Sequence, residues 1–598
     1  MFTTRPEITG TFGVVASTHW LASSVGMSML ERGGNAFDAC VASAFTLHVV
    51  EPHLVGPAGE VPGIFYSART KQVEVLCGQG PTPAAATLEN YRAQGLTLIP
   101  GNGLLATVVP GAFDAWMILL RDHGTKSLRE VLEPAIYYAQ TGHPMLPRVS
   151  NTIASLQDFF ETYWPTSASV YVPKGAVPQA GRLFCNPVLA GTWSRLLAEA
   201  ESVGGGREQQ IEKARQVFYK GFVAQAIDRF SASTEVMDES GVPHKGVITG
   251  EDMSRWSATY ESPLLYQYEN MTVAKAGPWS QGPAFLQTLA LLKHSDIKDV
   301  KPEDPRFIHL LVEAMKLAFA DREAYYGDPD FVDVPMSALL SEDYNRARSR
   351  LIGEKAFNEL RPGVVPGFEA QVDRVNAVLE RLSHNTDSTM LSAMDRANPV
   401  LSAKRGDTTH IDVIDRWGNM ITVTPSGGWL QSSPVIPELG FGLNTRAQMF
   451  WLEEGLPGTL AANKRPRTTL SPTFLFKDGA PYMALGTPGG DQQEQWQLAL
   501  FLRHLHHGMN LQQAIDTPLF HTQHFPSSFF PRGRKPGNIT IESSVGREVL
   551  DALRERGHEV EESPEWTIGR LTAASRDPDG LLHAAASPRL MQAYAVGR

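Results

Sequence analysis

A threonine at the junction of a polar segment and a strand, Thr408, has the surroundings of a self-activating nucleophile. If the peptide bond between Asp407 and Thr408 is cleaved, Thr408 gains an α-amine, whose pKa of about 7.7–8.0 suits a general base at neutral pH. A threonine hydroxyl is a poor nucleophile without such a base, and here both groups belong to one residue. The same hydroxyl can first attack the Asp407 carbonyl and form an ester that water hydrolyses. Taken alone, Thr-Thr-His is more often simply the start of a strand.

Two adjacent glycines, Gly489 and Gly490, could donate hydrogen bonds to a developing oxyanion. In the segment GTPGG they follow a predicted strand and precede the predicted helix DQQEQWQLALFLRH. Backbone N–H groups at such a helix start point towards one spot, and the helix dipole adds positive potential there. One donor in an oxyanion hole contributes roughly 3–4 kcal/mol to the transition state. Two glycines before a helix are more often a turn, so this interpretation depends on Thr408.

The elements that must position these residues alternate between extended and helical patterns. HIDVID and MITVT alternate with period two about the turn RWGN and predict a hairpin, and strand pairs are also predicted about Asp478–Gly479 and Asp579–Gly580. Residues 36–50 and 309–325 predict helices, as does the segment after Ser17 and Thr18, which are candidate N-caps. Residues 383–406 are polar and show neither period, which predicts a mobile segment that leads to Thr408.

The composition is that of a large globular protein acting on small molecules. Of its 598 residues, 42% are hydrophobic and 20% charged, and the net charge of −11 argues against a nucleic-acid surface. Three scattered cysteines, Cys40, Cys77 and Cys185, support neither a disulfide scaffold nor a CxxC metal site. We see neither a secretory signal nor an apolar run long enough to cross a membrane, so we expect a cytoplasmic protein.

Several segments of the chain, in this order, resemble the γ-glutamyltranspeptidase (glutathione hydrolase) family of N-terminal-nucleophile hydrolases. TTHIDVIDRWGNMITVT, NKRPRTTLSPT and GTPGG are similar to its small subunit, and VVASTHWLASSVGMSMLERGGNAFDACVA, VEPHLVGPAGE and VEAMKLAFADREAYYGDPDF to its large subunit. The resemblance covers nearly the whole chain and implies an α/β (α+β) fold, the αββα four-layer sandwich. It also implies one precursor processed into two subunits within one intertwined globular unit. Residues 1–382 would form the large-subunit body, 383–407 a flexible segment ending at the cleavage site, and 408–598 the small subunit.

The resemblance also assigns roles to individual residues. Thr408 matches the family's nucleophile, and Gly489 and Gly490 match its oxyanion-hole pair. Ser426 falls where the family has a hydroxyl residue near the new amine of the nucleophile. Two further residues, Thr468 and Thr469, replace a Ser-Ser pair that helps to hold the substrate carboxylate.

The departures from the family pattern concern the γ-glutamyl pocket. The family places an arginine against the α-carboxylate, where this chain has Gln79, and an aspartate against the α-ammonium, where an ungapped alignment gives Met449. A further asparagine position becomes Gly428. Losing both charge partners removes the strongest contacts that an amino-acid zwitterion can make. The resemblance therefore implies intact cleavage chemistry with an altered acyl pocket.

Three charged residues are candidates for replacing the lost partners. Arg446 or Arg467 could supply a cation near the site, and Glu60 introduces a carboxylate into a loop that is uncharged in the family. Arg446 would then bind the substrate carboxylate and Glu60 the ammonium.

Two histidine-rich segments invite a metal interpretation that we do not favour. His504, His506 and His507 lie at a predicted helix end before a glycine, where histidine suits the helix dipole. His521 and His524 follow nearby. We expect neither a metal nor a cofactor.

Three functions stay open at this stage. The first is an amide hydrolase or acyltransferase with altered acyl specificity, like the cephalosporin acylases and oxamate-type amidases of the family. The second is a true γ-glutamyltransferase or glutathione hydrolase, and the third an inactive relative that binds a small ligand. The retained Thr408 and glycine pair argue against the third. The expected partner is a small-molecule amide, and homo-oligomerisation stays open.

Overall fold

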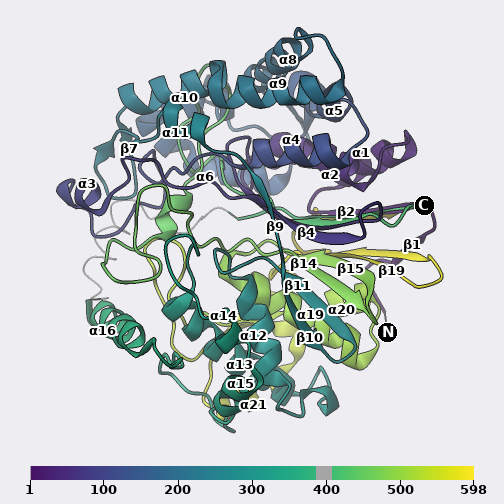
Figure 1. Ribbon diagram of the computed structural model, residues 1–598, viewed down its shortest axis with the longest axis vertical. Helices are drawn as coiled ribbons and strands as arrows, with labels where there is room; N and C mark the ends of the chain where they lie inside the picture. The colour runs from purple at the N-terminus through teal and green to yellow at the C-terminus, as the bar shows by residue number, and fades with distance from the viewer. Residues whose placement is uncertain (1, 386–406) are drawn as a thin grey trace.

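Two antiparallel sheets of seven strands each form the centre of the protein, in a computed structural model that describes residues 2–385 and 407–598 (Figure 1). The predicted mobile segment, residues 383–406, lies almost wholly outside the described residues. The first sheet has the order β1 (Ile8–Gly10), β20 (Leu582–Ala586), β19 (Thr572–Arg576), β15 (Ala480–Gly486), β14 (Thr473–Lys477), β11 (Met271–Lys275), β10 (Leu264–Tyr268). The second has the order β21 (Tyr594–Gly597), β2 (Gly13–Ser17), β12 (Ile411–Asp415), β13 (Met420–Val423), β3 (Val61–Ser67), β4 (Gln72–Gly78), β9 (Thr259–Glu261).

The two sheets face each other across a layer of mostly small apolar side chains. Val14, Ala16 and Ile64 from the second sheet pack with Ala274 and Ala584 from the first, all of them fully buried. Small side chains allow the backbones of stacked sheets to approach closely. Helix and sheet are thus mixed in one fold, as the sequence predicts.

Helices cover the outer face of each sheet (Figure 1). The helices over the second sheet are α1 (Trp20–Glu31), α2 (Ala36–Val50), α4 (Ala112–His123), α5 (Leu128–Thr141), α6 (Pro147–Tyr163), α8 (Pro187–Glu201), α9 (Arg207–Lys220) and α10 (Phe222–Ser233). The helices over the first sheet are α12 (Gly282–Leu292), α13 (Pro305–Tyr325), α19 (Gln493–His507), α20 (Leu511–Asp516) and α21 (Arg547–Glu555). Shorter or peripheral helices are α3 (Leu88–Ala93), α7 (Pro165–Tyr171), α11 (Gly250–Arg255), α14 (Met336–Leu339), α15 (Glu342–Ser349) and α16 (Glu369–Asn385).

Helix α2 is buried along its whole length, as its small and apolar residues predict. It starts with a capping box, in which the Asn35 side chain accepts from the Phe37 and Asp38 amides and the Asp38 carboxylate accepts from the Asn35 amide. These bonds satisfy amides that would otherwise be unpaired in the core.

The three predicted strand pairs are confirmed as β12–β13, β14–β15 and β19–β20. The predicted N-caps of α1 are wrong, because the cap is His19, whose Nδ1 accepts from the Leu21 amide at 3.0 Å. The Thr18 hydroxyl instead donates to Glu51 at 2.6 Å, and the Ser17 hydroxyl bonds to Ser23. A tertiary partner therefore outweighs the local cap.

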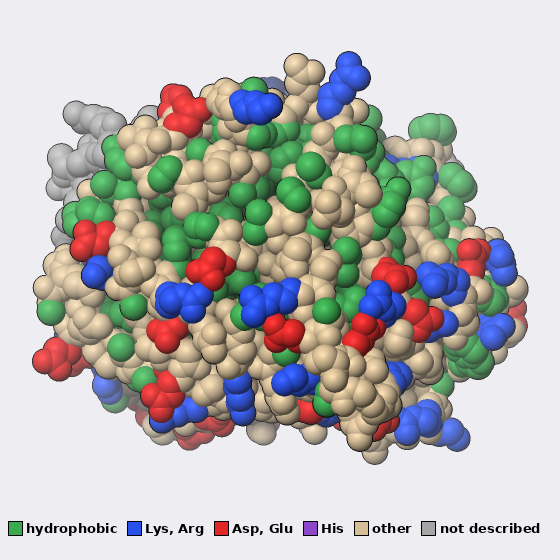
Figure 2. Space-filling view, turned by 90° about the horizontal axis from the view of Figure 1, so that it is seen from above, with side chains coloured by type: hydrophobic (Ala, Val, Ile, Leu, Met, Phe, Trp, Pro, Cys, Tyr) green, Lys and Arg blue, Asp and Glu red, His purple; other side chains and the backbone are tan. Residues whose placement is uncertain are grey.

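The face seen from above in Figure 2 carries acidic and basic side chains interspersed among hydrophobic and other ones. Arg129 of α5 pairs with Glu201 of α8, and Arg195 pairs with Glu199 at 2.8 Å on α8 itself. Charges mixed in this way do not make the clustered basic surface that phosphate binding requires. Among the described residues, no helix is long and apolar enough to span a bilayer.

Candidate active site

Thr408 lies three residues before β12, a strand in the middle of the second sheet. It forms an antiparallel bridge with Ser426, and the next residue, Thr409, donates its amide to the Pro425 carbonyl at 3.0 Å. The Thr408 side chain is buried. The candidate nucleophile is thereby held rigidly on the central strands, which is what a reacting group requires.

Ser426 connects the Thr408 hydroxyl to the peptide bond before it. The Thr408 hydroxyl donates to Ser426 Oγ at 3.2 Å, and Ser426 Oγ donates to the Asp407 carbonyl at 3.2 Å. Arg446 Nη2 donates to the same Ser426 oxygen at 3.0 Å. Ser426 Oγ therefore accepts two hydrogen bonds, so that its own proton points at the Asp407 carbonyl.

Arg446 and Glu60 form a buried ion pair behind Ser426. Arg446 Nε donates to Glu60 Oε1 at 2.5 Å, and both side chains are at most 2% exposed. Burial raises the pKa of Glu60, and the Arg446 charge opposes that rise. The two charges neutralise each other, so the pair offers no net charge to a substrate, while Glu60 Oε2 has no hydrogen-bond partner among the described residues. The side chain of Met449, with Sδ 4.0 Å from Arg446, lies beside this pair and brings no charge.

A second group of charged residues surrounds Asp407. Arg570, two residues before β19, donates to the Asp407 carboxylate and, at 3.3 Å, to the Thr408 carbonyl. Arg148 at the start of α6 has Nη2 3.7 Å from the same Asp407 oxygen. Nearby, Glu51 accepts from Thr18 and Gln592, and its pKa is raised to about 7 by burial despite the opposing charges of Arg570 and Arg148.

Gly489 and Gly490 lie between β15 and α19, as the sequence predicts. Their φ angles are +131° and +58°, a region that side chains rarely adopt, and a Cβ on Gly489 would collide with the Trp496 ring. Arg570 joins this loop to the nucleophile, because its amide donates to Thr487 Oγ1 at 3.2 Å while its guanidinium contacts Thr408.

Thr468 lies close to the same glycine loop. Gln281 donates its amide to the Thr468 carbonyl at 3.0 Å and its side chain to the Gly490 carbonyl at 3.0 Å. The neighbouring Thr469 hydroxyl is buried and has no hydrogen-bond partner among the described residues. The two threonines and the glycine pair are therefore brought together.

In the part of the chain that the structure describes, neither Gln79 nor Arg467 makes a hydrogen bond to Thr408, Ser426 or the glycine pair. The Gln79 amide bonds to the Gly80 carbonyl at 3.1 Å, and its Oε1 is buried without a partner. Arg467 pairs with Glu323 at 2.9 Å. Arg467 is thus already neutralised and offers no free cation.

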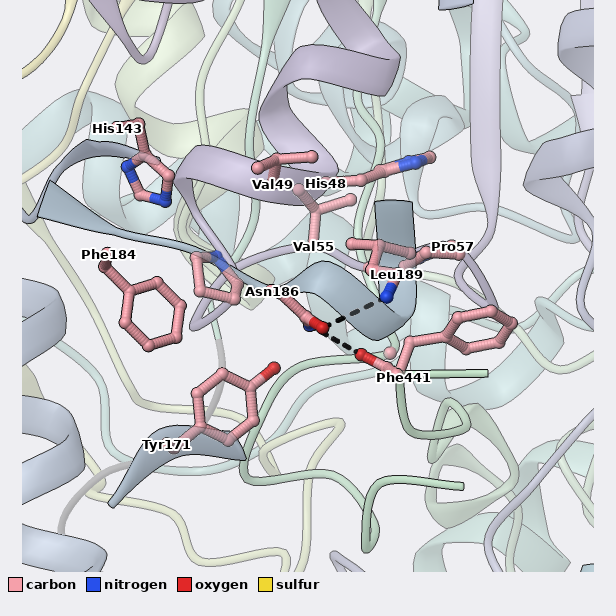
Figure 3. A pocket seen from close by; sticks show the side chains of 14 residues that line it. His48, Val49, Val55, Pro57, His143, Tyr171, Phe184, Asn186, Leu189 and Phe441 are labelled. Atoms are coloured by element: carbon pink, nitrogen blue, oxygen red, sulfur yellow. Dashed lines mark hydrogen bonds between the residues drawn. The ribbon is translucent and has the colours of Figure 1, made fainter. Parts of the chain in front are cut away.

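A cavity lies beside Gly428, on the loop that follows Ser426 (Figure 3). Its lining is mostly apolar and contains no Asp, Glu, Lys or Arg: His48, Val49, Pro52, Val55, Gly56, Pro57, His143, Tyr171, Phe184, Asn186, Leu189, Gly428, Gly440 and Phe441. The Asn186 side chain is occupied by the Leu189 amide and the Gly440 carbonyl. This cavity supplies no partner for the charges of a zwitterion.

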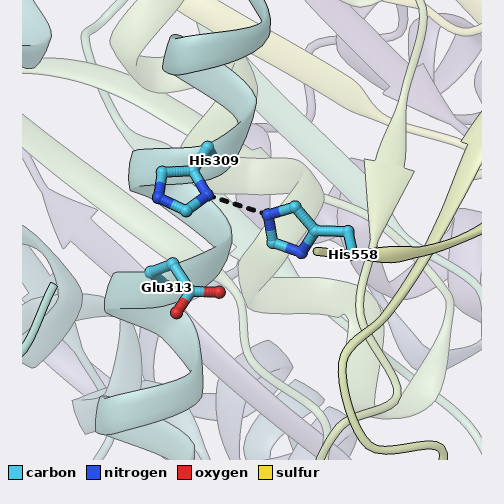
Figure 4. Close-up of side chains that lie close together, drawn as sticks. All are labelled: His309, Glu313 and His558. Atoms are coloured by element: carbon cyan, nitrogen blue, oxygen red, sulfur yellow. Dashed lines mark hydrogen bonds between the residues drawn. The ribbon is translucent and has the colours of Figure 1, made fainter. Parts of the chain in front are cut away.

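One cluster in the described part of the chain has metal-ligand chemistry: His309 and Glu313 lie on α13, and His558 lies just before β18 (Glu559–Ser563) (Figure 4). His309 Nδ1 and His558 Nε2 are 2.8 Å apart, and Glu313 lies one turn along the helix. The Glu313 carboxylate is already paired with the buried Lys316 at 2.5 Å, and the His309 Nε2 bonds to the Gly353 carbonyl. These contacts account for the cluster as internal packing. The histidines at the end of α19 are not part of this cluster. His504, for example, bonds to Tyr482 and to the Met509 carbonyl.

Sequence reasoning missed Arg148, Arg570 and Glu51. They come from three segments far apart in the chain, so no sequence motif of fixed spacing contains two of them. The available signal was weak: Glu51 directly follows the apolar helix α2, and Arg570 lies two residues before a buried strand. Charged residues in such places are rarely buried without a partner.

The fold and this site define a mixed helix–sheet protein with a buried threonine at the start of a central strand and a two-glycine loop at a helix start. The sequence profile of the Gamma-glutamyltranspeptidase family matches residues 22–597, and the chain belongs to that family. It is 30% identical over 590 residues to a glutathione hydrolase-like proenzyme, YwrD, of Bacillus subtilis, with 98% of each chain covered. It is 29% identical to the acylase ACY 1 proenzyme of a Pseudomonas species, covering 97% of this chain and 93% of that one. The solved structure of a threonine-to-alanine variant of LmbA2991 is 52% identical, with a TM-score of 0.92 and both chains covered in full.

Proposed function

We propose that the protein is a self-processing N-terminal-nucleophile amide hydrolase or acyltransferase with an altered acyl pocket. The observation that carries the proposal is the chain of hydrogen bonds from the Thr408 hydroxyl through Ser426 to the Asp407 carbonyl. The names of the relatives as proenzymes support processing of one precursor into two subunits. Two stacked sheets with helices on both outer faces support the αββα sandwich of this enzyme class.

Self-cleavage begins with attack of the Thr408 hydroxyl oxygen on the carbonyl carbon of Asp407. The hydroxyl proton passes to Ser426 Oγ, which gives its own proton towards the Asp407 carbonyl oxygen as that oxygen gains electron density. The carbonyl oxygen then returns its proton through Ser426 to the Thr408 nitrogen as the C=O bond re-forms and the Asp407–Thr408 C–N bond breaks, which leaves an ester between Asp407 and the Thr408 side chain. Water hydrolyses the ester, and Thr408 emerges with a free α-amine.

The processed enzyme repeats the same chemistry on an external amide. The α-amine of Thr408 takes the proton of its own hydroxyl, and the oxygen attacks the acyl carbonyl of the substrate. The Gly489 and Gly490 amides donate to the resulting oxyanion. The amine leaves with the proton, and water or a second amine takes the acyl group from Thr408.

The acyl group is proposed to lack the α-amino-acid pattern of γ-glutamyl compounds. The two positions that would bind the zwitterion hold Gln79 and Met449, and the nearby Arg446 and Glu60 neutralise each other. Each lost charged hydrogen bond is worth roughly 1.5–3 kcal/mol, so losing both weakens γ-glutamyl binding by about 10²–10⁴-fold. A relative named as an acylase supports a non-γ-glutamyl substrate.

A true γ-glutamyltransferase is the second candidate, supported by the relative named as glutathione hydrolase-like. An inactive ligand-binding protein is the third. The retained nucleophile, Ser426 contact and glycine loop argue against it, because ligand binding alone requires none of them.

One experiment tests the proposal in two readouts. The purified protein should give two fragments, residues 1–407 and 408–598, with the new N-terminus TTHIDV, while Thr408→Ala should stay in one piece. The processed protein should hydrolyse glutaryl-p-nitroanilide faster than γ-glutamyl-p-nitroanilide. An intact wild-type chain that is active would refute the mechanism, and a preference for the γ-glutamyl compound would favour the second candidate.

A further inference from the structure

Two arginines from distant segments converge on the residue that self-cleavage would set free. Arg570 donates to the Asp407 carboxylate and also to the carbonyl of Thr408, so it stays beside the nucleophile once Asp407 has left. Arg148 approaches the same carboxylate from α6. The Asp407 side chain is 23% exposed and that of Arg148 34%, so a small carboxylate can reach this place from solvent.

The charges at this place do not balance without Asp407. The charges that act on Arg148 are those of Arg570, Asp407 and Glu51, and burial together with Arg570 lowers its pKa to about 10. Of the charged groups that act on Arg148, Arg570 and Glu51 stay once Asp407 has left, so two arginines then face one carboxylate. In addition, Nη1 of Arg148 and Nη1 of Arg570 are buried with no acceptor in the described part of the chain. Arg570 is 1% exposed, and a buried cation without an anion is costly, so the site favours another anion.

The covalent chemistry fixes how far that anion lies from the nucleophile. In the ester formed during self-cleavage, the acyl group on the Thr408 oxygen is Asp407, whose carboxylate is separated from the ester carbonyl by two carbons. A succinyl group on the same oxygen has the same bonds between ester and carboxylate. Its carboxylate can therefore occupy the position that the Asp407 carboxylate leaves.

We propose that Arg570 and Arg148 form a subsite for the distal carboxylate of a short dicarboxylic acyl group, with succinyl as the matching length. The proposal rests on the proposed function, because self-cleavage is what vacates the subsite. It also deepens that function, since it supplies a cation in place of the one lost at Gln79. The two arginines bind and orient the acyl group, and the bond changes stay at Thr408: the amide C–N bond breaks, an ester forms, and water releases the dicarboxylate.

The direct test is ligand binding to the processed wild-type protein, measured as the rise in its melting temperature. Succinate and butyrate are titrated at matched ionic strength, because they have the same four carbons and differ in the second carboxylate. We expect succinate to raise the melting temperature at about tenfold or lower concentrations than butyrate. Equal effects of the two ligands would overturn the proposal.

Variants assign the effect to the arginine pair. Arg148→Gln should weaken succinate binding by about tenfold and leave butyrate unchanged, and Arg148→Lys should restore part of the difference. Arg195→Gln, which removes an exposed arginine paired with Glu199 on α8, should behave as the wild type. Full succinate binding by Arg148→Gln would overturn the proposal.

Two further arms separate the possible failures. After cleavage, Asp407 is the new C-terminal residue of the first fragment, and it could stay bound to the two arginines. In that case only the Asp407→Ala variant will bind succinate, and the arginines then hold the protein's own C-terminus and not the acyl group of a substrate. If the chain is not cleaved at all, the proposed function fails, and binding of succinate to the uncleaved Asp407→Ala chain still decides whether the subsite exists.

Kinetics provide a readout that a merely structural role would not change. Arg148→Gln should raise KM for succinyl-p-nitroanilide by about tenfold and leave KM for butyryl-p-nitroanilide unchanged. Loss of both activities to the same extent would show that Arg148 supports the fold and not the acyl group.

Discussion

At the scale of single residues, the oxygen of Ser426 is the point on which the site converges. It accepts from Thr408 and Arg446 and donates to the Asp407 carbonyl. Removing one donor to a developing oxyanion costs about 10²–10³ in rate, so Ser426→Ala should slow self-cleavage by that factor. Ser426→Thr, which keeps the hydroxyl, should cleave much faster than the alanine variant. The appearance of the fragment 408–598 on a gel over time measures both, and wild-type cleavage by Ser426→Ala would exclude the proton path through this residue.

Glu51 makes the stability of the uncleaved protein depend on pH. Its folded pKa of about 7 lies above its ordinary value of 4.5, so the folded state binds the proton more tightly than the unfolded state. Its contribution to stability is therefore fully present below about pH 4.5 and is lost as the pH rises through 7, on the order of 3 kcal/mol in total.

We expect Glu51→Gln, which resembles the protonated form, to flatten this dependence. Denaturant unfolding between pH 5 and 8 measures it, in a Thr408→Ala background that keeps Asp407 in place. An unchanged slope in Glu51→Gln would assign the dependence to other groups.

At the scale of elements, the loop between β15 and α19 must hold two glycines in conformations that other residues avoid. A Cβ on Gly490 would lie 2.8 Å from the Phe529 ring, in addition to the strain at φ +58°. Gly508, at the other end of α19, has φ +61° with open space around it. Gly508→Ala therefore reproduces the backbone strain of Gly490→Ala without touching the site.

We expect Gly490→Ala to reduce kcat by about 10²-fold or more, because the oxyanion donors shift. Gly508→Ala should lower the melting temperature somewhat and leave kcat at the wild-type value. Measurement of kcat and melting temperature in both variants distinguishes the two effects. Wild-type turnover by Gly490→Ala would place the oxyanion hole elsewhere.

Local patterns predicted the elements well where local physics determines them. The hairpins about Asp478–Gly479 and RWGN follow from period-two alternation and turn residues, and the buried helix α2 follows from its composition. The N-cap of α1 was missed because Thr18 bonds to Glu51, a residue from the end of the next helix. Such a contact is invisible to any local pattern.

At the scale of the whole molecule, the site also combines residues that local sequence can predict with residues that only tertiary packing brings together. Thr408, Ser426 and the glycine pair could be predicted as site residues because they lie in recognisable segments, and the structure places the Thr408 hydroxyl against Ser426. The arginines around Asp407 and the pairing of Arg446 with Glu60 depend on how distant segments pack. That Arg446 and Glu60 each bind a substrate charge stays a prediction, and the ion pair between them counts against it. Residue types alone cannot show that two charges neutralise each other.

The order of strands leads to a prediction about the processed protein as a whole. In the second sheet, β12 and β13 from the part after Thr408 lie between β2 and β3 from the part before it, and in the first sheet β14 pairs with β11. Cleavage at Asp407–Thr408 breaks one peptide bond and none of these ladders. The two fragments should therefore stay together, because separating them would expose both cores.

Gel filtration of the cleaved protein should give one species that contains both fragments in equal amounts, and they should separate only in denaturant. Its melting should be a single transition, matched by the uncleaved Thr408→Ala chain to within a few degrees. Fragments that separate in native buffer, or two melting transitions of which each belongs to one fragment, would contradict a single cooperative unit. The uncleaved chain is the control, since it shares every strand pairing and differs only in the bond before residue 408 and in the side chain there.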